Sequence, residues 1–112
     1  MPGYFLAVHL NATETENRHD TLMMINGGVA CLGQIAFEQG WETEAIDETF
    51  TGSEEPVEEI VSQKIDRALT QSQRAIVVGF SVLEYNARRS IELAQKLREK
   101  FGDHIKLIAG GQ

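Results

Sequence analysis

Residues of the types that form ligand-binding sites fall after the apolar runs of this sequence. They are Asn11, His19, Ser81, Leu83, Gly110 and Gly111. An imidazole can bind a metal ion, and a serine hydroxyl can hydrogen-bond to a ligand. Glycine has no Cβ, so a ligand can approach its backbone closely. Together these residue types favour the binding of a ligand, and we identify no catalytic residue among them.

The composition of this 112-residue chain excludes several classes of function. Its single cysteine, Cys31, excludes an intrachain disulfide and a multi-cysteine metal or cluster site. A net charge of −7 argues against binding to nucleic acid, which needs a dense basic patch. No run approaches the roughly 20 apolar residues that cross a bilayer, and the N-terminus lacks the basic segment of a signal peptide. We therefore expect a cytoplasmic protein that binds neither nucleic acid nor membrane.

Apolar runs and amphipathic segments alternate along the chain and predict a single α/β domain over residues 1–112. Strands are expected at 4–10, 41–47, 75–79 and 105–109, and helices at 23–39, 56–69 and 86–101. Short apolar strands are typical of parallel strands that helices cover on both faces. With right-handed crossovers, this order predicts a flavodoxin-like (Rossmann-like) doubly wound parallel sheet in strand order 2-1-3-4. Such folds normally continue with a further helix and strand, so we expect a partial domain, truncated before strand 5.

The expected sheet brings the candidate residues to one edge. In open parallel sheets the ligand crevice lies beyond the carboxyl ends of the strands, where the strand order reverses. The segments that follow the strands are 11–22, 47–48, 79–85 and 110–111. We predict that these segments line a crevice, with Ser81 and Leu83 on its rim. His104 precedes the fourth strand and is expected at the surface, whereas His9 is expected to pack within the first strand.

Two motifs at this predicted edge resemble those of a known family. The pattern Gly79-x-Ser81-x-Leu83 before a helix, with Gly110-Gly111 closing the fourth strand, resembles the cobalamin (vitamin B12)-binding domain. The runs 77–112 and 33–47 are most similar to the version at the N-terminus of cobalamin-dependent radical S-adenosylmethionine enzymes. These enzymes include methyltransferases and the anaerobic magnesium-protoporphyrin IX monomethyl ester cyclases. The resemblance covers most of residues 4–112.

The resemblance implies a cofactor and the residues that bind it. Ser81 and Leu83 are expected to line the pocket for the nucleotide tail of cobalamin, which Gly110 and Gly111 let approach the backbone. The corrin ring is expected to meet the loop that begins at Asn11.

His19 lies in this loop and is the candidate cobalt ligand implied by the resemblance. Asn17 and Leu22 stand where methylcobalamin-type domains carry Asp and Gly, so the loop departs from that pattern. The carboxylate that usually orients a ligating imidazole is therefore not at its expected place. A solvated histidine in a polar loop is the alternative interpretation.

The resemblance also implies partners. Radical chemistry needs three cysteines spaced Cys-x3-Cys-x2-Cys to hold a 4Fe–4S cluster, and Cys31 stands alone. We therefore expect a non-catalytic cobalamin-binding module of a larger enzyme. A downstream radical S-adenosylmethionine domain would bind the cluster and S-adenosylmethionine. If strand 5 is missing, the fourth strand is an open edge, and a homodimer through that strand is expected.

Two other function classes share the expected fold. A receiver domain needs an aspartate at the end of the third strand and an acidic pair after the first. This chain has Gly79-Phe80-Ser81 and Asn11-Ala12-Thr13 at those places, which disfavours a receiver. A ligand-free flavodoxin-like interaction domain is the remaining alternative.

Overall fold

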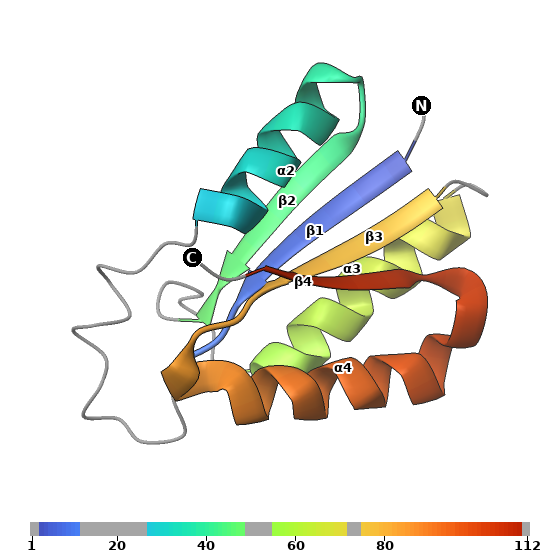
Figure 1. Cartoon of the computed structure of the whole chain (residues 1–112). Coiled ribbons are helices and arrows are strands. Elements are labelled where there is room, and N and C mark those ends of the chain that lie inside the picture. Colours follow the sequence, from blue (N-terminus) through green and yellow to red (C-terminus); the bar gives the residue numbers. More distant parts are fainter. Residues whose placement is uncertain (1–2, 12–26, 49–54, 72–74, 111–112) are drawn as a thin grey trace.

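The four strands form one parallel sheet in the order β2-β1-β3-β4, which confirms the predicted topology (Figure 1). The computed structural model describes residues 3–11, 27–48, 55–71 and 75–110. In these ranges the strands are β1 (Gly3–His9), β2 (Glu42–Asp47), β3 (Ala75–Ser81) and β4 (Lys106–Gly110). The helices are α2 (Gly27–Glu38), α3 (Val57–Gln71) and α4 (Ala87–Phe101), with short 3-10 helices η3 (Glu84–Asn86) and η4 (Gly102–His104).

The sheet lies between two helical layers. Helix α2 covers one face, and α3 and α4 cover the other (Figure 1). Side chains of successive strand residues point to opposite faces. In β1, Tyr4, Leu6 and Val8 belong to the core between the sheet and α3–α4, whereas Phe5 lies on the other face, beside Gly33 of α2. Residues Phe5, Ala7 and His9 of β1 therefore share the α2 face.

Helices α3 and α4 each bury one stripe of side chains on the sheet. In α3 the buried residues recur at helical spacing and are Val57, Val61, Ile65 and Ala68. In α4 they are Ser90, Leu93, Leu97 and Phe101. Ile91 has the apolar character and spacing of a core residue, but its side chain is 55% exposed and the buried stripe runs through Leu93 instead. Gly102 ends α4 as predicted, with a φ of 58° that suits a residue without Cβ.

Strand β3 is longer than the sequence predicts. The apolar run ends at Gly79, but Phe80 and Ser81 continue the ladder and pair with both neighbouring strands. Ser81 is therefore the last residue of a central strand, not part of a linker. This extension brings its side chain to the carboxyl edge of the sheet.

Among the described residues, no helix is long and apolar enough to span a membrane.

Candidate functional site

One residue from each strand forms a row across the carboxyl edge of the sheet. His9 of β1 pairs with Asp47 of β2 and with Ser81 of β3, and Ser81 pairs with Gly110 of β4. Paired residues in neighbouring strands project to the same face, so these four residues share the face of α2. We refer to Asp47, His9, Ser81 and Gly110 as the carboxyl-edge row.

The preceding residues on the same face are mostly small. Ala7 pairs with Ala45 of β2 and with Gly79 of β3, and Gly79 pairs with Ile108 of β4. Side chains no larger than a methyl group therefore lie next to His9 and Ser81 along β1 and β3. A cavity of about 410 Å³ lies beside α2 over β1 and β2, and Ala7 and Ala45 are part of its lining. A flat group can approach the sheet closely at such positions.

His9 is the most buried ionisable group of the row, with 8% of its surface exposed. Its Nε2 lies 2.9 Å from the hydroxyl oxygen of Tyr85, and the two rings meet edge to face at 6.2 Å. Its Nδ1 is buried and has no hydrogen-bond partner in the part of the chain that the structure describes. Burial lowers the pKa of His9, against the opposing effect of the Asp47 and Glu48 carboxylates, so the imidazole is neutral near pH 7.

Ser81 presents a second buried polar atom beside His9. Only 4% of the residue is exposed, and its Oγ has no partner within the described residues. Buried polar atoms in native proteins are almost always hydrogen-bonded, to protein, water or ligand. His9 Nδ1 and Ser81 Oγ are therefore two buried polar atoms on paired residues of neighbouring strands. Such a pair can form a binding site for a polar group of a ligand.

Asn86 holds the segment that follows Ser81. It is fully buried, and its Nδ2 donates to the carbonyl oxygens of Leu10 (2.9 Å) and Ser81 (3.0 Å). Its Oδ1 accepts from the backbone N–H of Leu83 at 2.7 Å. Asn86 occupies the N-cap position of α4, but its side chain makes no capping hydrogen bond to the helix. The side chain instead ties the ends of β1 and β3 to Leu83.

Backbone hydrogen bonding also joins the two predicted motifs. The N–H of Val82 donates to the carbonyl oxygen of Gly110 at 2.8 Å, so the chain beyond Ser81 continues along β4. Ser81 and Gly110 are therefore direct neighbours, and half-buried Leu83 follows at the same edge. The structure brings these three predicted site residues together.

Asn11 lies at the same edge, and both its backbone N–H and its backbone carbonyl oxygen are hydrogen-bonded to side chains. Its N–H donates to Glu48 Oε1 at 2.7 Å, and its carbonyl oxygen accepts from Arg89 at 3.3 Å. Arg89 and Glu48 form a two-pronged ion pair, in which Nη2 donates to Oε2 at 2.8 Å. The hydrogen bond to Glu48 raises the pKa of Arg89, in spite of its partial burial.

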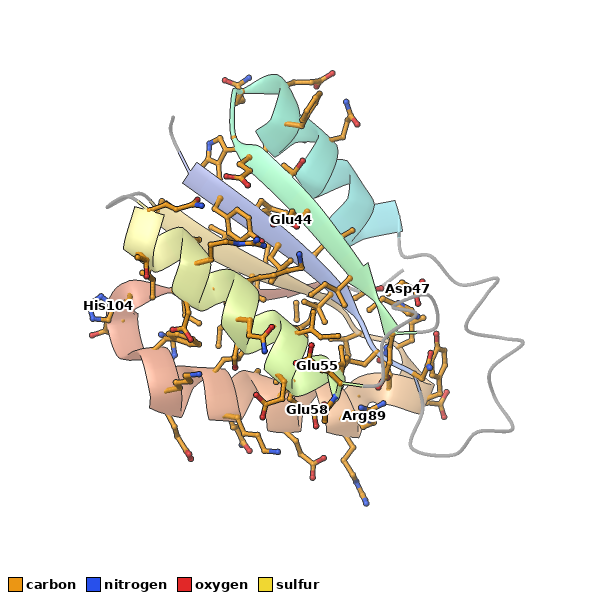
Figure 2. All side chains as sticks on the ribbon, turned by 180° about the vertical axis from the view of Figure 1, so that it is seen from behind. Glu44, Asp47, Glu55, Glu58, Arg89 and His104 are labelled. Carbon is orange, nitrogen blue, oxygen red and sulfur yellow. The ribbon has the colours of Figure 1, made fainter. Side chains whose placement is uncertain are left out.

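In Figure 2, Arg89, Glu58 and Asp47 lie at one end of the molecule, and exposed His104 lies at the other, as predicted.

A second polar cluster, on the α3 face, joins β1, β2 and α3. The Tyr4 hydroxyl donates to Glu44 at 2.7 Å, and Lys64 Nζ donates to the same carboxylate at 2.7 Å. Burial acts to raise the pKa of Glu44, but the bonds from Lys64 and Tyr4 leave it below its usual range. Since every member is paired within the cluster, we assign it a structural role at the β2 edge.

Two predicted site residues, His19 and Gly111, lie outside the described residues. Within the described ranges, no three His, Cys, Asp or Glu side chains are grouped so that they could hold a metal ion. Comparisons with protein-family models, with curated proteins and with solved structures find no match to this chain.

Sequence reasoning missed the place of His9 in the site, and it did not predict the contact between His9 and Tyr85. His9 is buried, as predicted, but it also faces Ser81 and is in contact with Tyr85. Part of this could be predicted from the alternation of side chains along a strand. His9 falls on the face of β1 opposite to the core residues Tyr4, Leu6 and Val8. The contact with Tyr85 could not be read from the sequence, because the two residues are far apart along the chain.

The lowered pKa of His9 predicts a pH-dependent stability. Below about pH 6.5 the unfolded chain binds a proton at His9 that the native protein does not, so the native state loses stability as the pH falls toward the native pKa. The slope from this group is at most about 1.4 kcal/mol per pH unit. Urea denaturation between pH 7.5 and 5 should show a shallower loss for His9→Gln than for the unchanged protein. His104→Gln is the control and should keep the full slope; equal slopes for all three proteins would contradict the prediction.

Proposed function

We propose that this chain is a cobalamin-binding module of the kind that accompanies a radical S-adenosylmethionine domain, and that it is not catalytic by itself. One observation carries the proposal: Ser81 of the Ser-x-Leu segment pairs with Gly110 of the glycine pair, and Val82 donates to the Gly110 carbonyl. The two motifs that resemble the cobalamin-binding family therefore line one place at the carboxyl edge.

The topology supports a ligand site at this place. In the order β2-β1-β3-β4, the connections leave β1 in one direction and β3 in the other, so the switch point lies between β1 and β3. His9 and Ser81 are the terminal residues of those two strands and face each other across the switch point. Ligands of open α/β sheets bind at this position.

The residues present fit the nucleotide tail of cobalamin. The tail carries ring nitrogens and hydroxyl groups, and the buried Ser81 Oγ and His9 Nδ1 have no partners among the described residues. Gly110 lets the tail approach the backbone, and half-buried Leu83 is held by Asn86 at the rim. When bound, cobalamin would supply the cobalt-centred chemistry, while this chain's residues bind and orient the cofactor.

The remaining parts of the proposal extend beyond the described residues. The corrin ring would meet the loop that begins at Asn11, with His19 as cobalt ligand, and Gly111 would add to the tail site. A downstream domain would bind the 4Fe–4S cluster and S-adenosylmethionine and choose the substrate. The cytoplasm is the compartment that we propose.

Cobalamin binding can be tested directly by colour. The protein is mixed with hydroxocobalamin, passed through a desalting column and measured by visible absorption; titration then gives the affinity. We expect Gly110→Val to lower the affinity by about tenfold or more, or about 1.4 kcal/mol, because the branched side chain fills the space that the tail needs.

His104→Ala is the control for this experiment, since His104 is exposed at the opposite end of the molecule. It should bind cobalamin within about twofold of the unchanged protein. Equal losses for the two variants would refute this placement of the tail. A folded protein that stays colourless would refute cobalamin binding and favour the ligand-free interaction domain.

A further inference from the structure

We propose that two copies of this chain associate through α2, with Phe37 of each copy inserted into a cavity beside α2 of the other. The inference does not rest on the proposed function, and it concerns a surface other than the β4 edge. We call this surface the α2 surface. It consists of the exposed side chains of Ile35 and Phe37 and of the cavity walls formed by Phe5, Ala7, Gly33, Gln34, Thr43 and Ala45.

The apolar outer face of α2 is the first argument. Three large hydrophobic side chains are exposed among the described residues, and two of them, Ile35 (55%) and Phe37 (61%), are on α2. No charged residue occurs in 27–37, whereas α3 and α4 each carry several. A surface helix normally has a charged or polar outer face, and a helix that is apolar all round is normally buried. The outer face of α2 therefore has the character of an interface.

The shape of the α2 surface is the second argument. A two-fold interface needs a patch that fits a copy of the same patch. Phe37 is exposed, and it also borders a cavity of about 410 Å³, which is larger than one aromatic side chain. A two-fold axis beside Phe37 lets each phenyl ring enter the cavity of the other copy. This exchange would cover both exposed rings and fill both cavities.

The distribution of charge is the third argument, and it favours a second copy at this place. Each copy has a net charge of −7, so two copies repel each other over most of their surfaces. The side chains that form the cavity walls are uncharged. Glu44 also borders the cavity, but its carboxylate accepts hydrogen bonds from Tyr4 and Lys64 on the opposite face of the sheet. Two acidic molecules can therefore meet here without opposed charges.

The arrangement of the helices leaves the α2 surface accessible. Helices α3 and α4 lie on the other face of the sheet, so neither of them covers α2 (Figure 1). Ala45 of β2 is exposed, which shows that the cavity is open to solvent on the β2 side. A second copy can approach from this side.

The oligomeric state tests the inference and is measured by analytical ultracentrifugation over a concentration series. The unchanged protein should dimerise, and added salt should strengthen the dimer because it screens the repulsion between two negative copies. Phe37→Glu should weaken the dimer by about a hundredfold or more, since each dimer loses two buried phenyl rings. Ala45→Lys, which puts a charge into the cavity, should weaken it by about tenfold or more.

Two variants outside the α2 surface are the controls. Ile91→Glu changes a side chain of α4 that is 55% exposed, as Ile35 is, and Ala109→Lys changes an exposed residue of β4. Both variants should dimerise within about twofold of the unchanged protein. The inference is overturned if either control weakens the dimer as much as Phe37→Glu does, because the contact would then involve β4 and α4.

A mixture of two variants tests the exchange itself. When Phe37→Glu is mixed with Ala45→Lys, one contact brings the new carboxylate to the new ammonium group, and the other keeps a phenyl ring in an unchanged cavity. The mixture should form a one-to-one heterodimer at concentrations where each variant alone is monomeric. Phe37→Gln replaces Phe37→Glu if the latter fails to fold by circular dichroism, and should weaken the dimer by about tenfold. An unchanged protein that stays monomeric at every concentration, or a Phe37 variant that dimerises normally, would refute the inference.

Discussion

Replacing Asn86 by alanine is expected to lower the free energy of unfolding by about 3 kcal/mol. The side chain satisfies three buried backbone groups: the carbonyls of Leu10 and Ser81 and the N–H of Leu83. Each loses its partner when the amide is removed, at about 1 kcal/mol or more per group. Because Leu83 also loses its anchor, we expect the rim of the site to become mobile. Urea denaturation followed by circular dichroism measures the loss.

The variant Asn86→Asp is a second test of the prediction that the Asn86 amide stabilises the protein through its three hydrogen bonds. Aspartate keeps an acceptor for Leu83 but places a carboxylate oxygen against two carbonyls, so it should be at least as destabilising as alanine. Gln95→Ala, on the exposed side of α4, is the matched control and should change stability by less than about 0.5 kcal/mol. A loss below about 1 kcal/mol for Asn86→Ala would show that the three bonds do not hold the edge.

Replacing Arg89 by methionine is expected to destabilise the protein by about 2 kcal/mol. The side chains of Arg89 and Glu48 are only 22% and 20% exposed, and removal of Arg89 leaves the mostly buried Glu48 carboxylate without its ion-pair partner. The carbonyl of Asn11 also loses a donor. The double variant Arg89→Met with Glu48→Gln should regain part of the loss, because no unpaired charge remains. Chemical denaturation of both variants measures the difference.

Lys100→Met tests whether the effect depends on burial. Lys100 and Asp66 also form an ion pair, at 3.5 Å, but their side chains are 51% and 57% exposed. Exposed pairs contribute about 0.5 kcal/mol or less, so this variant should be close to neutral. Equal losses for Arg89→Met and Lys100→Met would contradict the conclusion that the buried pair of Arg89 and Glu48, which also bonds to the backbone of Asn11, contributes more than an exposed pair.

The fold could be predicted because its signals are local. Each strand is a short apolar run, and the stripe of α3 from Val57 to Ala68 repeats at helical spacing. The handedness of crossover connections then leaves few topologies for alternating strands and helices. The order 2-1-3-4 was therefore accessible from the sequence and is confirmed.

The errors arise where distant residues decide the local structure. Ser81 belongs to β3 because His9 and Gly110 pair with it, and no local pattern marks those partners. Asn86 looks like a helix cap, but its side chain bonds to Leu10, which the fold brings close. The juxtaposition of Ser81 and Gly110 followed from the topology, whereas the contact of His9 with Tyr85 did not. Cobalamin, the downstream domain and the homodimer stay predictions.

The central place of β1 has a consequence for how the protein folds. β1 is the first element of the chain, yet its partner β3 follows only after α2, β2 and α3, and Gly3 pairs with Ala75. Contacts within α3 and α4 can form early, but the central pair of the sheet forms only when β1 meets β3, about 70 residues further along the chain. Folding dominated by such distant contacts is slow. During synthesis from the N-terminus, Leu6 and Val8 therefore stay exposed to solvent or chaperones until β3 has left the ribosome.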